Sequence, residues 1–150
     1  MRLSQAEEKD LPEILKLQYL AYQSEAELLG NPHILPLTQT LAEVEAQFRD
    51  GFAFLKAVEE ETGRIIGSVR ANVTDGTLFV GKLFVHPDFR GLGIGSQLLR
   101  EIEKQLPHTR CELFTSARSV RNLQLYERCG YVRFREVTGI ENVPMVFLEK

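Results

Sequence analysis

Residues 84–106, FVHPDFRGLGIGSQLLREIEKQL, constrain the fold more than any other part of this 150-residue chain. An apolar segment leads directly into a turn with glycines at positions 91, 93 and 95, and an amphipathic segment follows. Because glycine has no Cβ, such a turn lets several backbone N–H groups approach one anion, and the start of the next helix adds its positive dipole end. The stretch therefore predicts a strand, a loop and a helix that together bind an anionic ligand.

The composition predicts one domain over residues 1–150, because 43% hydrophobic residues suffice for a single core in a chain of this length. No apolar run approaches the roughly 20 residues that a membrane span requires. Glu7, Glu8 and Asp10 stand where a secretory signal would have its apolar core. We therefore expect a cytoplasmic protein without a membrane partner.

Charge and cysteine content argue against other classes of function. The net charge is −3 and basic residues form no block, which disfavours nucleic acid as a partner. Cys111 and Cys129 lack a CxxC spacing and a nearby histidine cluster, so neither a metal site nor a disulfide framework is indicated. Both are expected to be buried, reduced thiols.

The first third of the chain predicts two helices separated by a loop, after a short strand at residues 2–5. Each helix begins with the residues of a capping box: Asp10 with Glu13, and Thr40 with Glu43. Glycines at positions 30 and 51 are expected to end the helices. The segment between them, residues 31–39, contains two prolines and is expected to be a loop.

The rest of the chain predicts an antiparallel meander followed by alternating helices and strands. The meander strands are expected at 52–60, 64–74 and 77–85. A helix to about residue 105, a strand at 110–116, a helix at 120–128 and strands at 131–137 and 144–150 follow. This order predicts a mixed α/β (α+β) fold, a mostly antiparallel sheet of about six to seven strands flanked by about four helices.

Three phosphate-binding motifs compete for the glycine turn. A nucleoside-triphosphate loop ends in Gly-Lys-Ser/Thr, and GLGIGS has no lysine. A dinucleotide fingerprint needs a third glycine where Ser96 stands, and its fold opens with this unit rather than after a meander. The pyrophosphate pattern R-x-x-G-x-G is matched by Arg90, Gly93 and Gly95 directly after a predicted strand.

With this loop, the segment resembles motif A of the GNAT superfamily, the acyl-CoA-dependent N-acyltransferases. Residues 122–131, NLQLYERCGY, are similar to the family's second cofactor motif, in which an Asn opens a helix, a Leu-Tyr pair lies inside it and a Gly-aromatic pair starts the next strand. The order of elements also resembles the family over nearly the whole chain. The resemblance implies a GNAT-like sheet with a splayed strand pair at the cofactor site.

The resemblance further implies acetyl-CoA as a co-substrate, with no metal. The backbone of Leu83, Phe84 and Val85 would hydrogen-bond the pantetheine arm, and Asn122 would contact the same arm. The hydroxyl of Tyr126 would protonate the departing thiolate, which is the work of a general acid. The diphosphate would lie on the N–H groups of Arg90, Gly91, Leu92, Gly93, Ile94, Gly95 and Ser96.

The general base is not evident from the resemblance. Many members of the superfamily carry a Glu on the strand that corresponds to residues 78–85, and this chain has Gly81 and Lys82 there. The open alternatives are bulk water and the side chains of Glu25, Glu27, His33 and His86. The acceptor pocket is expected between the loop of the helix pair and the strand ends, near Tyr22, Glu25, His33, Thr38 and Gln39.

Two functions of different classes remain open at this stage. The first is an N-acetyltransferase in which a small-molecule or peptide amine attacks the thioester directly. The second is a non-catalytic acyl-CoA-binding sensor or regulatory module. Absence of the strand glutamate favours the sensor, whereas Tyr126 favours the enzyme. The acceptor and the choice of acyl group are left open, and the C-terminal strands could form a homodimer contact.

Overall fold

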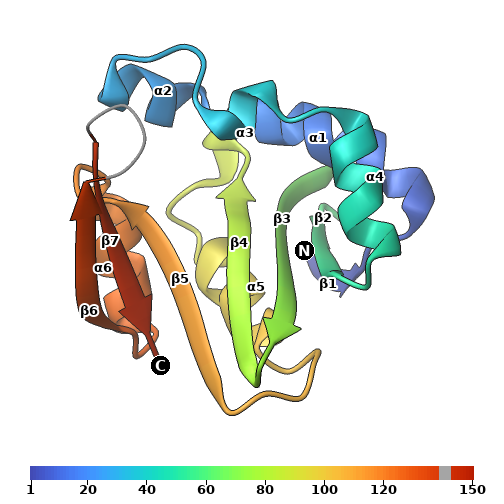
Figure 1. Ribbon diagram of the computed structural model, residues 1–150. Coiled ribbons are helices and arrows are strands. Elements are labelled where there is room, and N and C mark those ends of the chain that lie inside the picture. Colours follow the sequence, from blue (N-terminus) through green and yellow to red (C-terminus); the bar gives the residue numbers. More distant parts are fainter. Residues whose placement is uncertain (139–142) are drawn as a thin grey trace.

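A computed structural model describes residues 1–138 and 143–150. Within these residues, one seven-stranded sheet runs in the order β1-β2-β3-β4-β5-β7-β6 (Figure 1). Neighbouring strands are antiparallel except for β4 and β5, which are parallel. The strands are β1 (Arg2–Gln5), β2 (Ala53–Val58), β3 (Ile65–Thr74), β4 (Thr77–Val85), β5 (Arg110–Ser116), β6 (Val132–Thr138) and β7 (Pro144–Glu149).

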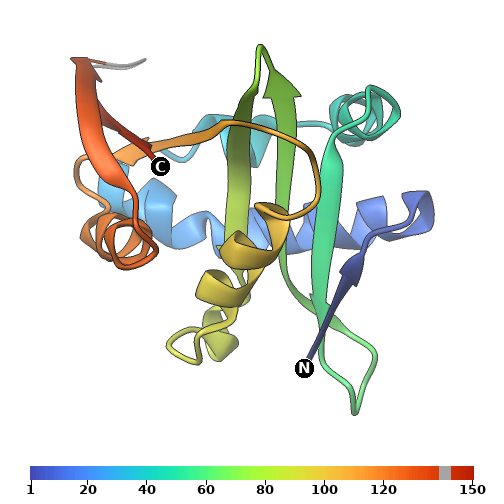
Figure 2. The ribbon, with the colours of Figure 1, turned by 90° about the horizontal axis from the view of Figure 1, so that it is seen from below.

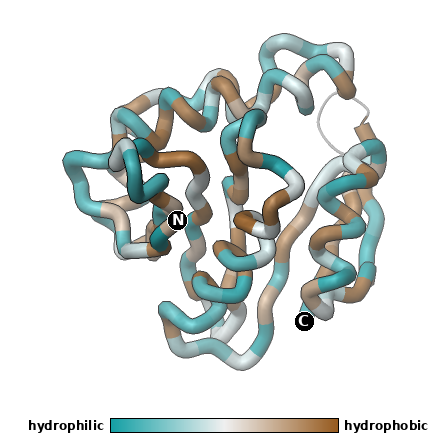
Figure 3. The backbone as a smooth tube through the Cα atoms, turned by 180° about the vertical axis from the view of Figure 1, so that it is seen from behind, coloured by the Kyte–Doolittle hydropathy of each residue, from teal (hydrophilic) through white to brown (hydrophobic). Residues whose placement is uncertain are grey.

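Helices cover both faces of the sheet. Figure 2 shows α5 and α6 on one side and α4 on the other, where α1 shares an apolar cluster with α4. Brown and teal stretches alternate along α5 and α6 in Figure 3, as expected for helices with one apolar face. The helices are α1 (Leu11–Ala21), α2 (Gln23–Leu29), α3 (Leu35–Thr38), α4 (Leu41–Arg49), α5 (Ile94–Ile102) and α6 (Val120–Arg128).

The parallel strands β4 and β5 pair only at one end and then separate. Their register covers three pairs, beginning at Thr77 with Arg110 and ending at Phe79 with Glu112. Beyond these pairs, β4 contains a bulge against β3, where Lys82 has a φ of +50°. A bulge bends its strand and increases the local twist, so β4 turns away from β5. The expected GNAT-like sheet with a splayed strand pair is confirmed.

Helix α5 packs closely on the sheet at Gly67 of β3. Ile94, Leu98, Leu99 and Ile102 form the buried stripe of α5. A Cβ on Gly67 would lie 3.1 Å from the Leu98 Cδ1 atom and 3.2 Å from the Phe84 carbonyl oxygen. The glycine thus sets how deeply α5 sits over β4, immediately after the glycine turn.

The predicted first helix needs two corrections. It is interrupted at Tyr22, so α1 and α2 are separate helices. Asp10 and Glu13 do not form the expected capping box, because both carboxylates have partners outside α1. Asp10 accepts from the Glu7 N–H at 2.8 Å and from Lys56 Nζ at 2.7 Å, and Glu13 accepts from the Ile65 N–H at 2.9 Å.

Other predictions for single elements and residues agree more closely with the structure. Thr40 and Glu43 form the predicted capping box at the start of α4. The expected loop at 31–39 includes the short helix α3, because Pro36 stands in its first turn, where proline needs no N–H partner. Cys111 and Cys129 are buried free thiols, as predicted. In the described residues, no helix combines the length and apolarity that crossing a membrane requires.

Candidate active site

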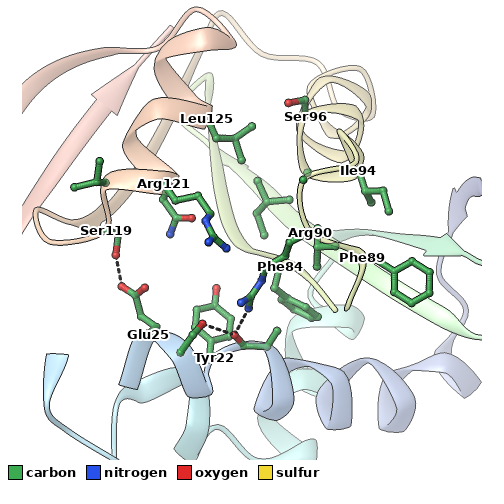
Figure 4. A pocket seen from close by; sticks show the side chains of 18 of the residues that line it. Tyr22, Glu25, Phe84, Phe89, Arg90, Ile94, Ser96, Ser119, Arg121 and Leu125 are labelled. Carbon is green, nitrogen blue, oxygen red and sulfur yellow. Dashed lines mark hydrogen bonds between the residues drawn. The ribbon is translucent and has the colours of Figure 1, made fainter. Parts of the chain in front are cut away.

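A cleft of about 770 Å³ lies where β4 leaves β5. This is within the size range of small-molecule and cofactor sites. Its walls come from residues within 21–28 at the α1–α2 junction, 83–85 of β4, 89–96 of the glycine turn and α5, and 118–128 of the β5–α6 turn and α6 (Figure 4). The cleft therefore joins the two cofactor motifs predicted from the sequence.

The glycine turn places the start of α5 in this cleft. Gly91 and Gly93 have φ values of +79° and +82°, which only glycine adopts readily, and a Cβ at either would meet no atom within 4 Å. Backbone conformation, rather than crowding, requires these glycines. Because the first N–H groups of a helix have no partner within it, the turn directs free donors toward the cleft.

Gly95 serves a different purpose from the two glycines before it. It lies inside α5, and a Cβ there would be 3.3 Å from the Leu125 Cδ2 atom of α6. Glycine thus keeps open the narrow space between α5 and α6. Ser96 and Ile94 also line the cleft, whereas the Leu92 side chain is 66% exposed and does not.

Strand β4 presents free backbone to the cleft. Gly67 and Ser68 of β3 pair with Val85 and Phe84 on one side. On the other side, the pairing with β5 has already ended at Phe79. The segment 83–85 thus has one edge available for an extended ligand.

The cleft is positively charged. Arg90, Arg118, Arg121 and Arg128 line it, and within the described lining Glu25 is the only acidic residue. Arg90 donates from Nη2 to the Ala21 carbonyl oxygen at 2.8 Å, which ties the glycine turn to the end of α1. Burial lowers the pKa of Arg90, and the nearby charge of Arg121 lowers it further. Such a concentration of positive charge favours an anionic ligand.

Tyr126 lies on the buried side of α6 and is 7% exposed. It is not part of the described cleft wall, but Tyr22 and Glu25 are its electrostatic neighbours. Burial raises the pKa of its hydroxyl well above the usual value, and Tyr22 and Glu25 raise it further. Within the described residues, this hydroxyl makes no hydrogen bond to another protein group. It is therefore a protonated group with an unused donor.

The predicted acceptor residues fall into two groups. Tyr22 and Glu25 line the cleft, whereas His33 and Gln39 do not. Gln39 instead accepts from Gln18 Nε2 at 3.0 Å and from Arg70 Nη1 at 3.3 Å in a partly buried network. Asn122 lines the cleft, and its Nδ2 donates to Thr115 Oγ1 at 3.3 Å.

Sequence reasoning missed the residues of the β5–α6 turn. Arg121 and Arg128 are seven positions apart, so α6 can present both on one face, and Arg118 lies in the turn just before the helix. That spacing was the available signal. Ser119 carried no signal, because its partner Glu25 is far away in the chain and their hydrogen bond depends on the fold.

The fold and cleft together define the class of the protein: an α/β acyltransferase fold with a splayed strand pair. The acetyltransferase (GNAT) family model matches residues 13–131, and the chain belongs to this family. It is similar in structure to a ribosomal-protein-alanine N-acetyltransferase from Brucella melitensis, with 20% identity, a TM-score of 0.79 and coverage of 100% of this chain and 99% of that one. A phosphinothricin acetyltransferase from Sinorhizobium meliloti, in complex with acetyl-CoA, has 20% identity, a TM-score of 0.78 and coverage of 99% and 86%.

The chain also matches parts of two longer curated proteins. UPF0157 protein YqkA of Bacillus subtilis is 26% identical over 132 residues, which is 87% of this chain and 37% of that protein. The uncharacterized N-acetyltransferase ycf52 of Porphyra purpurea is 25% identical over 75 residues, 49% of this chain and 43% of that protein. The chain thus spans less than half the length of either curated relative.

Proposed function

We propose that this protein is an N-acetyltransferase that transfers the acetyl group of acetyl-CoA to a primary amine in a ternary complex. The observation that carries the proposal is that one cleft contains both the free edge of β4 and the start of α5. An extended, amide-bearing arm needs the first, and a diphosphate needs the second. Family membership supports the general activity.

The binding of acetyl-CoA is assigned mainly to backbone groups. Residues 83–85 of β4 bind the pantetheine arm as an added strand would, and Asn122 contacts the same arm from α6. The N–H groups of residues 90–96 bind the diphosphate, with Leu92 contributing only its backbone. The arginines of the cleft neutralise phosphate charge.

The chemistry is assigned to direct attack, without a covalent enzyme intermediate. The amine nitrogen attacks the thioester carbonyl carbon, whose oxygen is stabilised by backbone N–H near Val85. As the C–S bond breaks, Tyr126 donates its proton to the sulfur. The raised pKa of Tyr126 supports this role, because the hydroxyl stays protonated at neutral pH.

One observation favours a second candidate, a non-catalytic acyl-CoA sensor. The bulge of β4 has Gly81 and Lys82 where many family members have an acid. Burial lowers the pKa of Lys82, and the charge of Arg70 lowers it further. A sensor binds CoA through the same cleft and releases no thiol with any amine.

The acceptor and the oligomeric state belong to the proposal as well. The structural neighbours include enzymes named for a ribosomal-protein alanine and for phosphinothricin, so both peptide and small-molecule amines are suitable to test. A homodimer contact is proposed at the edge strand β6, where Val132 and Phe134 are 65% and 41% exposed. Sedimentation of the wild type beside Phe134→Glu tests that contact. The same molecular mass in solution for both proteins contradicts it.

Calorimetric titration with CoA tests the binding half of the proposal. We expect one site per chain in the wild type and equal affinity in Tyr126→Phe, because the hydroxyl acts on the leaving sulfur rather than on binding. A wild-type protein that binds no CoA contradicts both the enzyme and the sensor.

A further inference from the structure

The proposed reaction needs a group that takes a proton from the acceptor amine, and β4 supplies no acid for it. We propose that Glu25 is this general base. The inference rests on the proposed acetyltransferase function and adds the residue that completes it. Glu25 lies on α2, whose first turn follows the interruption at Tyr22 and faces the cleft (Figure 4).

Location selects Glu25 among the candidates from the sequence. It is the only carboxylate in the described cleft wall, and no histidine belongs to that wall. Glu27 is on the same helix but exposed to solvent. His86 accepts from the Asp88 N–H at 3.0 Å through Nδ1, so it caps the turn that follows β4. Lys82 is partly buried and lies outside the described wall.

The surroundings of Glu25 suit a base that must be held in place. Its Oε1 accepts a hydrogen bond from the Ser119 hydroxyl, across the cleft. Within the described residues, its Oε2 atom has no hydrogen-bond partner, so this oxygen is free to take a proton from the acceptor amine. Ser119 is therefore a positioning residue, because it acts through Glu25.

Titratable or charged groups surround Glu25 from several parts of the chain, whereas the β4 segment 83–85 contributes none. Tyr22 comes from the α1–α2 junction, Arg90 from the glycine turn and Arg118 from the β5–α6 turn. Tyr126 and Arg121 come from α6, which also carries Arg128. Burial raises the pKa of the Tyr22 and Tyr126 hydroxyls, and the Glu25 charge adds to the rise in both. Glu25 therefore lies within electrostatic reach of the proposed acid.

The proton transfers balance with this assignment. An acceptor that arrives as an ammonium gives one proton to Glu25, and the free amine then attacks. The C–N bond forms and the C–S bond breaks as the Tyr126 proton moves to sulfur. The second nitrogen proton returns to the Tyr126 oxygen. Glu25 releases its proton to solvent, so each turnover yields one thiol, one amide and one proton.

The test compares Glu25→Gln with Glu27→Gln, a matched change on the exposed side of the same helix. Glutamine retains an oxygen for the Ser119 hydroxyl, so the melting temperature and CoA affinity of both variants should equal those of the wild type. We expect kcat to fall by about 100-fold in Glu25→Gln and to stay within twofold in Glu27→Gln. The pH profile of Glu25→Gln should also differ from that of the wild type. The rate of the variant should follow only the fraction of acceptor present as free amine.

Chemical rescue separates a base from a structural residue. Formate added to Glu25→Ala should restore activity at least tenfold, because a small carboxylate can occupy the vacated space. Equal kcat and an unchanged pH profile in Glu25→Gln overturn the assignment, as does a loss that appears only in the acceptor KM. If kcat falls in Lys82→Met but is normal in Glu25→Gln, Lys82 rather than Glu25 is the general base. If the wild type binds CoA but turns over no amine, the proposed function itself fails, and this assignment with it.

Discussion

The Glu25 carboxylate and the Ser119 hydroxyl are hydrogen-bonded although they are 94 positions apart in the chain. Glu25 belongs to α2 on one side of the cleft, and Ser119 belongs to the β5–α6 turn on the other. The bond therefore connects the two parts of the chain between which the proposed acceptor would enter. Its partners are accordingly sensitive points for both stability and catalysis.

Ser119→Ala should lower the free energy of unfolding by about 1–2 kcal/mol, because it removes a hydrogen bond to a charged group. Denaturant unfolding measures this loss. Ser24→Ala is the control, since its hydroxyl makes only a 3.4 Å contact with the Ala21 carbonyl oxygen. Equal stability of the two variants contradicts a stabilising role for the Glu25–Ser119 bond.

Gly95→Ala should separate fold stability from cofactor binding. Alanine favours a helix over glycine by up to about 1 kcal/mol, so the melting temperature should not fall. The new Cβ would press on Leu125 Cδ2 at 3.3 Å and push it into the space between α5 and α6. CoA affinity should drop about tenfold by calorimetry, and unchanged affinity would show that this space is not used.

Arg121→Gln should weaken CoA binding about tenfold at low salt and progressively less as salt rises, because screening reduces the charge interaction. The matched control is Arg133→Gln on β6, whose guanidinium pairs with Glu127 at 3.0 Å on an exposed face. Equal losses in both variants would mean that overall charge, rather than the cleft, governs binding.

Asp10→Asn should destabilise the fold in a pH-dependent way. Burial alone would raise the pKa of Asp10, but the Lys56 ion pair and the Glu7 N–H overcome this and lower it. A lowered folded-state pKa means that the stabilisation is present above the unfolded pKa and is lost as pH falls through the folded value. We expect a cost of about 2–3 kcal/mol at pH 7 and much less near pH 2.

Urea unfolding at the two pH values measures this difference. Glu8→Gln is the control, because the Arg49–Glu8 bridge is exposed on both sides and contributes little. A cost for Asp10→Asn that is independent of pH would contradict the ion-pair account.

The sequence predicted those elements that depend on local signals. The glycine turn, the stripe of α5 and the Thr40–Glu43 capping box involve residues within a few positions of one another, so the pattern carries the structure. The predicted capping role of Asp10 was wrong because its carboxylate pairs with Lys56, a distant residue on β2. Local preference was overridden by a tertiary contact.

The same distinction applies to the cleft. The motifs predicted Val85 and Asn122 at the cofactor site, because each lies beside its own signature residues, and both line the cleft. Nothing local distinguishes Glu25 from Glu27, and only the fold shows that Glu25 lines the cleft while Glu27 is exposed. His33, expected near the acceptor, lies outside the described wall.

Thiol release from acetyl-CoA across a panel of primary amines, wild type beside Tyr126→Phe, tests the central claim most directly. The proposed function predicts turnover with one amine class, a fall of at least tenfold in the variant and unchanged CoA affinity. CoA binding without thiol release from any amine would contradict the enzyme and favour the sensor. Full activity in Tyr126→Phe would leave the transferase in place but remove Tyr126 as its acid.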